Sequence, residues 1–180
     1  MRLRGAKDRA PQPSVVRLLA IAALVATMPS GCAVPRRVAE PKVSPDRLSA
    51  TAFVHYLAEA PVVTVDEGGR AALLLAGRDT ADASDRWAWL RSRGMVRTSW
   101  NLSPDSVLDH GTFAFMLCRA LDIEPDLNAR LASLFGIGRR RAAMRTAVYE
   151  GLLDPVAAHD PIAGGAVAAA LARAEFWRAR

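Results

Sequence analysis

From residue 45 onwards the apolar positions return every three to four residues, which is the spacing of one face of an α-helix. Capping and stop signals divide this pattern into separate helices. The first three are expected over 45–60, between Ser44 and Pro61, from Thr64 to a stop at Gly77, and from a cap at Thr80 or Asp82 to a stop at Gly94. Four more are expected from Asp109 to about 121, over about 125–135, over 139–150 and over 163–178. No stretch combines period-two alternation with turn signals. The pattern therefore predicts an all-α fold, with one compact multi-helix domain over 45–180.

Two local signals within this pattern are more specific than its period. Thr64 and Glu67 have the spacing of a capping box, in which each side chain accepts a hydrogen bond from the backbone amide of the other residue. The segment FAFMLCRAL places Cys118 in an apolar helical stripe, and free cysteine is among the most buried residue types. We therefore expect Cys118 to be a core residue rather than a reactive thiol.

The N-terminal segment 1–31 has the pattern of an export signal. Basic residues precede an apolar run over 18–28, in which only Thr27 is polar. A membrane-spanning helix needs about 20 apolar residues, so this shorter run fits the apolar core of a secretory signal. Ser30 and Gly31 then lead to Cys32. This ending resembles the lipobox of bacterial lipoproteins, although Pro29 stands where that family usually has an aliphatic residue.

The lipobox resemblance implies cleavage before Cys32 and acyl chains on this residue, which would hold the protein in a membrane. Residues 32–44, with Pro35 and Pro41, would then form an extended tether. The expected location is the cell envelope, at the outer membrane or at the periplasmic face of the inner membrane. The alternatives are a plain secretory signal with an ordinary Cys32 thiol, and an uncleaved apolar segment.

Part of the positive charge of the chain belongs to this signal. The whole chain has 24 basic and 18 acidic residues, a net charge of +6. Residues 1–31 hold five of the basic residues and one of the acidic ones, which leaves 19 against 17 and a net charge of +2 for 32–180. Nucleic-acid binding needs clustered positive charge, and an export signal opposes retention in the cytoplasm. We therefore expect no nucleic-acid partner.

Two segments of the chain, 106–120 and 160–174, match position by position. The matched pairs are Leu108 with Ile162, Gly111 with Gly165, Arg119 with Arg173 and Ala120 with Ala174. Upstream of each segment a glycine stop is followed by two apolar residues, in RSRGMV and in VYEGLL. The repetition predicts two similar helical units, at about 82–121 and 139–178. Chance similarity in an alanine-rich sequence is the alternative.

This unit resembles the S-layer homology (SLH) module, a helical repeat whose second helix opens with a Thr-Arg-Ala-Glu motif that binds cell-wall polymer. The matching positions here are Asp109-His110-Gly111-Thr112 and Ala163-Gly164-Gly165-Ala166, so the resemblance implies the architecture but no binding through that motif. Over 62–178 the chain is also similar to a group of uncharacterised planctomycete lipoproteins. The similarity lies in DHGTFAFMLCRAL, in the arginines before AVYEGLL, and in the Gly-Gly that opens the last helix.

No catalytic or metal-binding constellation is recognisable in the sequence. His55, His110 and His159 each lack a second ligand at the spacing that would place two ligands on one helical face. The glycines around Ile137 are not followed by the third glycine of a dinucleotide site, and no strand precedes them. We therefore expect no catalytic residue, no metal and no small-molecule cofactor.

The candidate binding surface is a local arginine cluster together with tryptophan side chains. The cluster consists of Arg139, Arg140, Arg141 and Arg145. Cations at a helix start are opposed by the helix dipole, which favours a binding role, with a simple solvated surface as the alternative. The tryptophans that we place with the cluster are Trp89 and Trp100, whichever of them is exposed.

The sequence thus predicts a non-enzymatic, lipid-anchored envelope protein with a structural or adaptor role. Its partner would be an envelope polymer or another envelope protein. The alternative is an enzyme, or a subunit of one, whose site is assembled from scattered residues. A pocket that gathers His110, His159 and carboxylates would favour the enzyme, whereas a flat helical face with exposed arginine and tryptophan would favour the binding protein.

Overall fold

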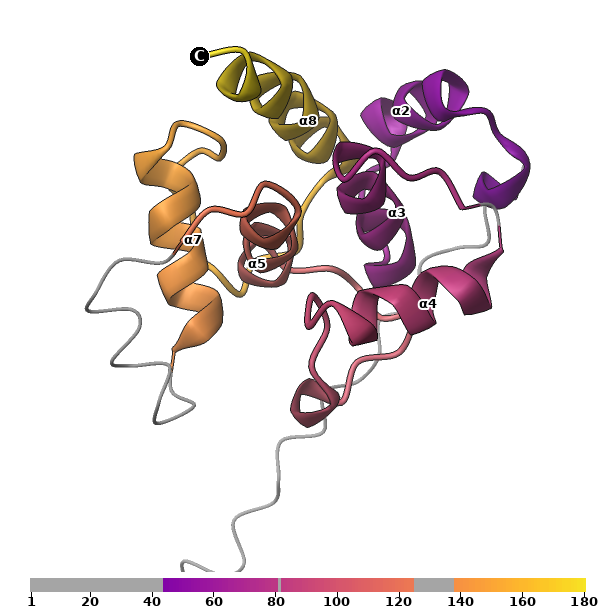
Figure 1. Cartoon of the computed structure of the whole chain (residues 1–180), viewed down its shortest axis with the longest axis horizontal. Coiled ribbons are helices and arrows are strands. Elements are labelled where there is room, and N and C mark those ends of the chain that lie inside the picture. The colour runs from indigo at the N-terminus through magenta and orange to yellow at the C-terminus, as the bar shows by residue number, and fades with distance from the viewer. Residues whose placement is uncertain (1–43, 81, 125–137) are drawn as a thin grey trace, which may run out of the picture. The chain divides into compact units, whose positions relative to one another are not determined.

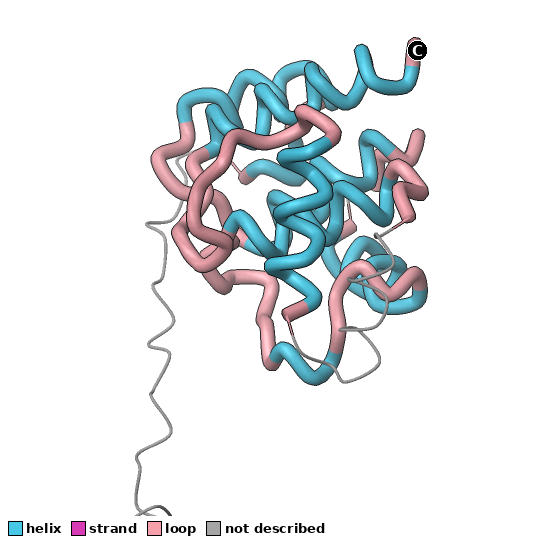
Figure 2. Tube along the Cα trace, turned by 90° about the vertical axis from the view of Figure 1, so that its left-hand side faces the viewer, coloured by secondary structure: helices cyan, strands magenta, loops and turns pink. Residues whose placement is uncertain are grey.

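The computed structural model describes residues 44–80, 82–124 and 138–180, all of which belong to the unit Pro35–Arg180 (Figure 1). The described residues form the following helices: η1 (Pro45–Arg47), α2 (Ala50–Glu59), α3 (Val65–Leu75), α4 (Ala83–Ser92), η2 (Thr98–Trp100), α5 (His110–Ala120), α7 (Arg139–Tyr149) and α8 (Gly164–Arg178). The described residues are helical or lie in loops, and they contain two isolated β-bridges but no β-strand (Figure 2). The predicted all-α fold is confirmed. The export signal, Cys32, the tether up to residue 43 and the helix expected over 125–135 lie outside the described residues.

The starts of α3, α4 and α5 are set by side-chain caps. In the capping box of α3, the amide of Glu67 donates to Thr64 Oγ1 over 3.2 Å and the amide of Thr64 donates to Glu67 Oε2 over 2.7 Å. Asp82, rather than Thr80, caps α4, and Asp109 caps α5 by accepting from the amide of Thr112 over 2.6 Å. Each cap satisfies backbone amides that have no partner within the helix.

The start of the first long helix differs from the prediction of 45–60. A 3-10 turn, η1, comes first, Leu48 is extended, and α2 begins only at Ala50, with Ser49 accepting from the amide of Ala52. The carbonyls of Pro45 and Leu48 accept hydrogen bonds from the buried Arg70 guanidinium. These tertiary bonds hold the turn in place of a continuous helix. A second 3-10 turn, η2, lies in the connection 95–102, where no helical period was predicted.

Three buried residues form a closed ring of backbone hydrogen bonds at the centre of the helices. The amide of Val63 donates to Ile162 O over 3.2 Å, that of Ile162 donates to Leu108 O over 3.0 Å, and that of Leu108 donates to Val63 O over 2.8 Å. The side chains of all three are fully buried. Each ring residue is followed by the N-cap of a helix, α3, α5 or α8. The ring therefore fixes the starting points of three helices that are far apart in sequence.

The helices pack in pairs around this ring. Helix α4 packs on α3, α7 packs on α5, and α2 packs on α8, while α3 also contacts α5 and α8 (Figure 1). The first and last of the described α-helices thus form one of the three pairs. Leu108 and Ile162, which the internal repeat matches with each other, occupy equivalent places in the ring.

The glycine stops of α4 and α7 have the same geometry. Gly94 and Gly151 have φ values of +66° and +72°, which residues with a side chain rarely adopt. The two residues after Gly94 both donate to Leu90 O, and the two residues after Gly151 both donate to Ala147 O. These bonds satisfy the last carbonyls of each helix and turn two apolar residues into the core. Both stops lie at the predicted positions.

Two buried arginines, which the sequence analysis did not single out, hold η1 against the domain. Arg70 on α3 is 2% exposed and donates to Pro45 O over 2.5 Å, to Leu48 O over 2.7 Å and to Asp79 over 3.0 Å. Its guanidinium lies 4.4 Å from the centre of the Phe53 ring. The stem of a buried arginine contributes packing while its polar atoms require partners, and here carbonyls, a carboxylate and a ring supply them.

Arg86 on α4 is 1% exposed and makes the second set of contacts. It donates to both carboxylate oxygens of Asp66, to Asp46 in η1 over 2.6 Å and to Thr80 O over 2.8 Å. Burial alone would lower the pKa of this guanidinium, but the hydrogen bonds and charges of Asp66 and Asp46 raise it above its usual value. Arg86 therefore stays charged and ties η1, α3 and α4 together.

Candidate functional site: a basic and aromatic surface

Helix α7 begins with three arginines and without a side-chain cap. Gly138, in the left-handed conformation with φ of +73°, precedes Arg139, Arg140 and Arg141. The exposed amides of a first turn carry partial positive charge, so cations there are unfavourable for the helix itself. The arginines of this turn differ in the contacts that they make with the rest of the domain.

Arg140 is the member of the cluster that faces the rest of the domain. Its Nη1 donates to Asp109 Oδ2 over 2.8 Å and to Thr112 Oγ1 over 3.4 Å, at the start of α5. Its guanidinium lies 5.3 Å from the centre of the Trp100 ring, and its side chain is still 37% exposed. Arg140 is therefore oriented by a carboxylate and an indole while part of it stays open to solvent.

Aromatic side chains continue this surface from Trp100. The rings of Trp100 and Phe115 meet edge to face at a centroid distance of 5.0 Å. The guanidinium of the exposed Arg119 lies 5.7 Å from the Phe115 ring. Two half-buried rings thus lie next to each other, each with an arginine above it, which is an arrangement in which cation–π attraction restrains the guanidinium groups.

Positive charge accumulates on the same side of the domain. Partial burial, and then the charges of Arg97 and Arg119, lower the pKa of Arg139. Like charges that disfavour each other in this way favour an anion placed among them. We call Arg97, Arg119, Arg139 and Arg140, with Trp100 and Phe115, the basic–aromatic surface.

The remaining arginines of the predicted cluster lie elsewhere on α7. Arg141 is exposed and its Nη2 lies 3.0 Å from His159 Nε2, while Arg145 is exposed one turn further along the helix. Tyr149, a further turn along, is exposed as well. The four arginines predicted as one cluster therefore do not face one way: Arg140 turns to Trp100, whereas Arg141 and Arg145 lie on the exposed side of α7.

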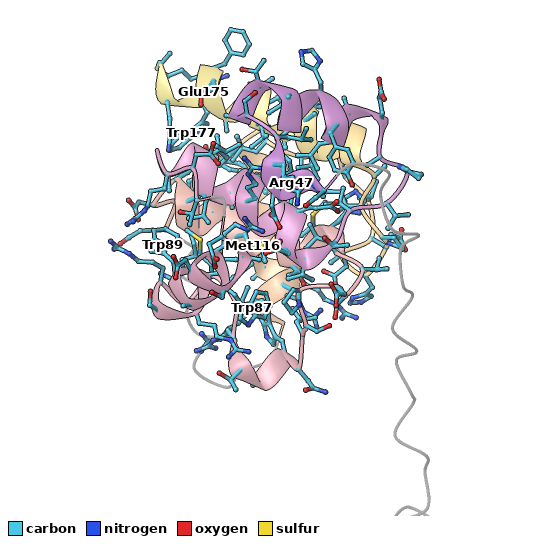
Figure 3. The ribbon with its side chains drawn as sticks, turned by 90° about the vertical axis from the view of Figure 1, so that its right-hand side faces the viewer. Arg47, Trp87, Trp89, Met116, Glu175 and Trp177 are labelled. Carbon is cyan, nitrogen blue, oxygen red and sulfur yellow. The ribbon has the colours of Figure 1, made fainter. Side chains whose placement is uncertain are left out.

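Trp89 forms a different group on α4. Its ring lies between the guanidinium groups of Arg78, at 5.6 Å, and Arg93, at 5.4 Å. Trp87, two residues earlier, lies beneath Arg91 at 5.1 Å. Both indoles are half-buried against the core, and Figure 3 shows them apart from Trp177 on α8. None of the contacts of Trp89 involves an arginine of α7.

Two of the three histidines, His110 and His159, contact or belong to the same segment of the chain. His110 Nδ1 lies 3.0 Å from Asp160 O, and His159 pairs with Arg141. Within residues 44–80, 82–124 and 138–180, no three His, Cys, Asp or Glu side chains are placed to hold a metal ion. Cys118 is buried, and burial, followed by the charge of Glu150, raises the pKa of its thiol to about 12. Its placement in the core is confirmed.

An open apolar groove with a volume of about 480 Å³ lies between α2 and α8. Apolar side chains such as Val54 and Leu171 line most of it, with His55 and Glu175 among the remaining lining residues. Neither His110 nor His159 contributes to this groove. No helix in the described part of the chain is both long enough and apolar enough to span a bilayer.

Sequence reasoning found Arg140 and Trp100 but missed most of their partners. Asp109 and Thr112 were singled out as a helix cap and as positions of the SLH motif, Arg119 as a match of Arg173 in the internal repeat, and Phe115 as part of an apolar helical segment, but none of them as a partner of the arginine cluster. Arg140 and Asp109 are far apart in the sequence, and the chain between them carries no motif that joins them. Only the packing of α7 on α5 brings them together.

Comparison with known proteins gives no further assignment, because no protein-family model, no curated protein and no solved structure matches this chain.

Proposed function

We propose that this chain is a non-enzymatic lipoprotein of the bacterial cell envelope whose helical domain docks an anionic envelope partner through the basic–aromatic surface. Acyl chains on Cys32 hold it in a membrane, and the domain 45–180 works outside the cytoplasm. The observation that carries the docking role is the position of Arg140 above Trp100 and of Arg119 above Phe115, with the two rings in edge-to-face contact.

The anchorage part of the proposal rests on the N-terminal sequence. The apolar run of 18–28 is too short to span a bilayer, and Ser30-Gly31-Cys32 follows it closely. Several acyl chains bind a membrane almost irreversibly, since each buried CH₂ contributes about 0.8 kcal/mol. Acylation of Cys32 would therefore make the attachment permanent and leave the domain free to engage a second partner.

We also propose that the domain is related to SLH modules, on the basis of its architecture alone. In chain order, α4 followed by α5 and α7 followed by α8 have the same glycine stop after the first helix and the same ring position before the second. In space α4 packs on α3 and α7 packs on α5. The Thr-Arg-Ala-Glu motif of that family is absent at 109–112 and 163–166. The docking site proposed here therefore uses other residues.

The basic–aromatic surface has three features that suit a docked anion. Arg140 is held by Asp109 and Trp100, so little side-chain freedom is lost when a ligand binds. Like charges from Arg97, Arg119 and Arg139 are already close, and a negative group relieves their repulsion. Half-buried rings beside arginines are typical of interaction hot spots.

The enzyme alternative has no comparable support. His110 contacts the backbone oxygen of Asp160, next to His159, but the ring of His159 faces Arg141, and neither histidine lines the mostly apolar groove between α2 and α8. We therefore propose no reaction, cofactor or nucleic-acid partner for this domain.

Replacing Arg140 with Gln is expected to weaken binding of the protein to an anionic polymer about tenfold, because a hydrogen bond to a charged group is worth about 1.5 kcal/mol or more. The measurement is the dissociation constant for poly-L-glutamate, a defined polyanion, and for polymer extracted from the bacterial envelope.

The matched control is Arg91→Gln, which removes an arginine from above Trp87 at 5.1 Å on α4 without touching α7. Arg119→Gln removes an exposed guanidinium from the surface and leaves the Asp109 ion pair intact, so it tests docking even if Arg140→Gln loosens the fold. Equal affinities for the Arg91, Arg119 and Arg140 variants would rule out docking at this surface.

A further inference from the structure

The outer face of α7 carries a stripe of residues whose roles the docking site does not explain. Arg141, Arg145 and Tyr149 follow each other one helical turn apart, and all three are exposed. The opposite face of α7, with Ala143, Met144 and other small apolar residues, is buried in the core. Figure 1 shows α7 at the edge of the domain, with α5 beside it. The outer face of α7 is therefore basic.

Large exposed apolar side chains gather at the C-terminal end of this stripe. Tyr149 is 88% exposed and Phe176, near the end of α8, is 76% exposed. The residues that follow them, Glu150 and Trp177, are joined by a hydrogen bond of 3.0 Å, so the two helix ends meet at one corner of the domain. Within the described ranges the remaining large apolar residue of this kind is Val156, in the loop after α7.

Of the acidic groups near this corner, Glu175 is exposed next to Phe176, whereas Glu150 and Asp154 have partners. Glu150 accepts from Trp177, and Asp154 forms an ion pair with Arg173 at 3.1 Å. The stripe itself contains no acidic residue between Arg139 and Tyr149. The field above Arg141 and Arg145 is therefore positive, and an approaching anionic surface meets no repulsion from α7.

We infer that the outer stripe of α7, Arg141, Arg145 and Tyr149, together with Phe176, lies on an anionic phospholipid surface. The two guanidinium groups pair with headgroup phosphates, and the two rings enter the boundary between headgroups and acyl chains. Tyrosine rings are enriched at the level of the lipid headgroups, and arginines close to an anionic leaflet are attracted to it, so the exposed stripe offers both kinds of contact.

The inference goes beyond the docking site, whose residues it does not use, but it rests on the proposed anchorage at Cys32. A domain tethered by residues 32–44 stays within about 45 Å of the bilayer, because an extended chain spans at most about 3.5 Å per residue. Contact through the stripe would fix the orientation of the tethered domain on the membrane. The basic–aromatic surface, which shares no residue with the stripe, would stay available to a partner.

The test uses the full acylated chain in vesicles, with a photoreactive benzoyl-phenylalanine in place of Tyr149. In phosphatidylcholine vesicles that contain phosphatidylglycerol, this position is expected to cross-link to lipid. The same group in place of the exposed Thr51 on α2 is expected to give only background. Without phosphatidylglycerol, lipid cross-linking from position 149 falls to that background.

Adding Arg141→Gln and Arg145→Gln is expected to lower lipid cross-linking from position 149 about thirtyfold, since each arginine near an anionic surface contributes about a fivefold factor. The matched control is Arg91→Gln with Arg93→Gln, which removes two exposed arginines from α4 and leaves cross-linking unchanged.

Three results would overturn the inference: equal lipid cross-linking from positions 51 and 149, no effect of the Arg141 and Arg145 replacements, or cross-links from position 149 to protein instead of lipid. Failure of the anchor is recognised separately, because then every variant, including the controls, fails to float with the vesicles. Arg140→Gln, which tests the docking site, is expected to leave lipid cross-linking unchanged.

Discussion

Replacing Arg86 with Met is expected to lower the free energy of unfolding of the domain by about 3 kcal/mol. Removal of one partner from a buried ion pair costs about 3–5 kcal/mol, because the remaining charge stays desolvated without a counter-charge. Asp66 would be left in this state, with 18% of its side chain exposed. Asp46, at 39%, can be solvated by water, which places the expected loss at the lower end of the range.

The measurement for Arg86→Met is urea unfolding followed by helical circular dichroism. Arg91→Met is the matched control, because it removes an exposed arginine from the same helix and is expected to change stability by less than about 0.5 kcal/mol. The loss should also loosen η1 on its α4 side, where Asp46 and Arg86 join it to that helix, while Arg70 still holds its carbonyls. Equal stability of the Arg86 and Arg91 variants would contradict the role given to this ion pair.

Gly164→Ala is expected to destabilise the domain by at least about 3 kcal/mol. A Cβ at this position would lie 1.8 Å from Leu57 O, a backbone atom that cannot turn away. Overpacking of a tight site costs about 1–3 kcal/mol, and more where backbone must move. Helix α8 starts here, packed against α2, and the amide of Gly164 donates to Ala60 O over 2.9 Å.

The neighbouring glycine provides the control for this clash. A Cβ at Gly165 would lie 3.6 Å from Ala58 O, which is ordinary contact. Alanine is a better helix former than glycine, so Gly165→Ala is expected to stabilise the domain by up to about 1 kcal/mol. Thermal and urea unfolding of both variants measure the difference. Similar stabilities for the two would show that α2 and α8 do not approach as closely as described here.

The helices could be predicted because their limits are set locally. Thr64, Asp82 and Asp109 cap their helices with their own side chains, and Gly94 and Gly151 end theirs through a backbone conformation that needs glycine. The start of α2 was missed for the opposite reason. Pro45 satisfies the rules for a first helical residue, but Arg70 and Arg86, which are distant in the sequence, hold its turn apart from α2.

The candidate site could be predicted only in part. Arg139, Arg140 and Arg141 form a visible run, but the direction of each side chain depends on where α7 packs. Arg140 turns to Asp109 and Trp100, and Arg141 turns to His159. Trp89 was placed with them from residue type alone, whereas the fold surrounds it with Arg78 and Arg93.

The ring of Val63, Leu108 and Ile162 shows a similar limit. The internal repeat related Leu108 to Ile162, and both proved to be buried ring members. Val63 completes the ring although the segment around it shares no motif with the other two. The extended segment before each of these helices needs little more than one buried apolar residue, because its ring hydrogen bonds are made by the backbone. Such segments can therefore form the same hydrogen bonds without similar sequences.

The proposal as a whole depends on the covalent state of Cys32, and mass spectrometry of the N-terminal peptide of the membrane-bound protein measures it directly. We expect a peptide that begins at Cys32 and carries the added mass of acyl chains. A peptide that begins at Met1 and contains an unmodified Cys32 would contradict the proposed anchorage and, with it, the envelope role of the domain.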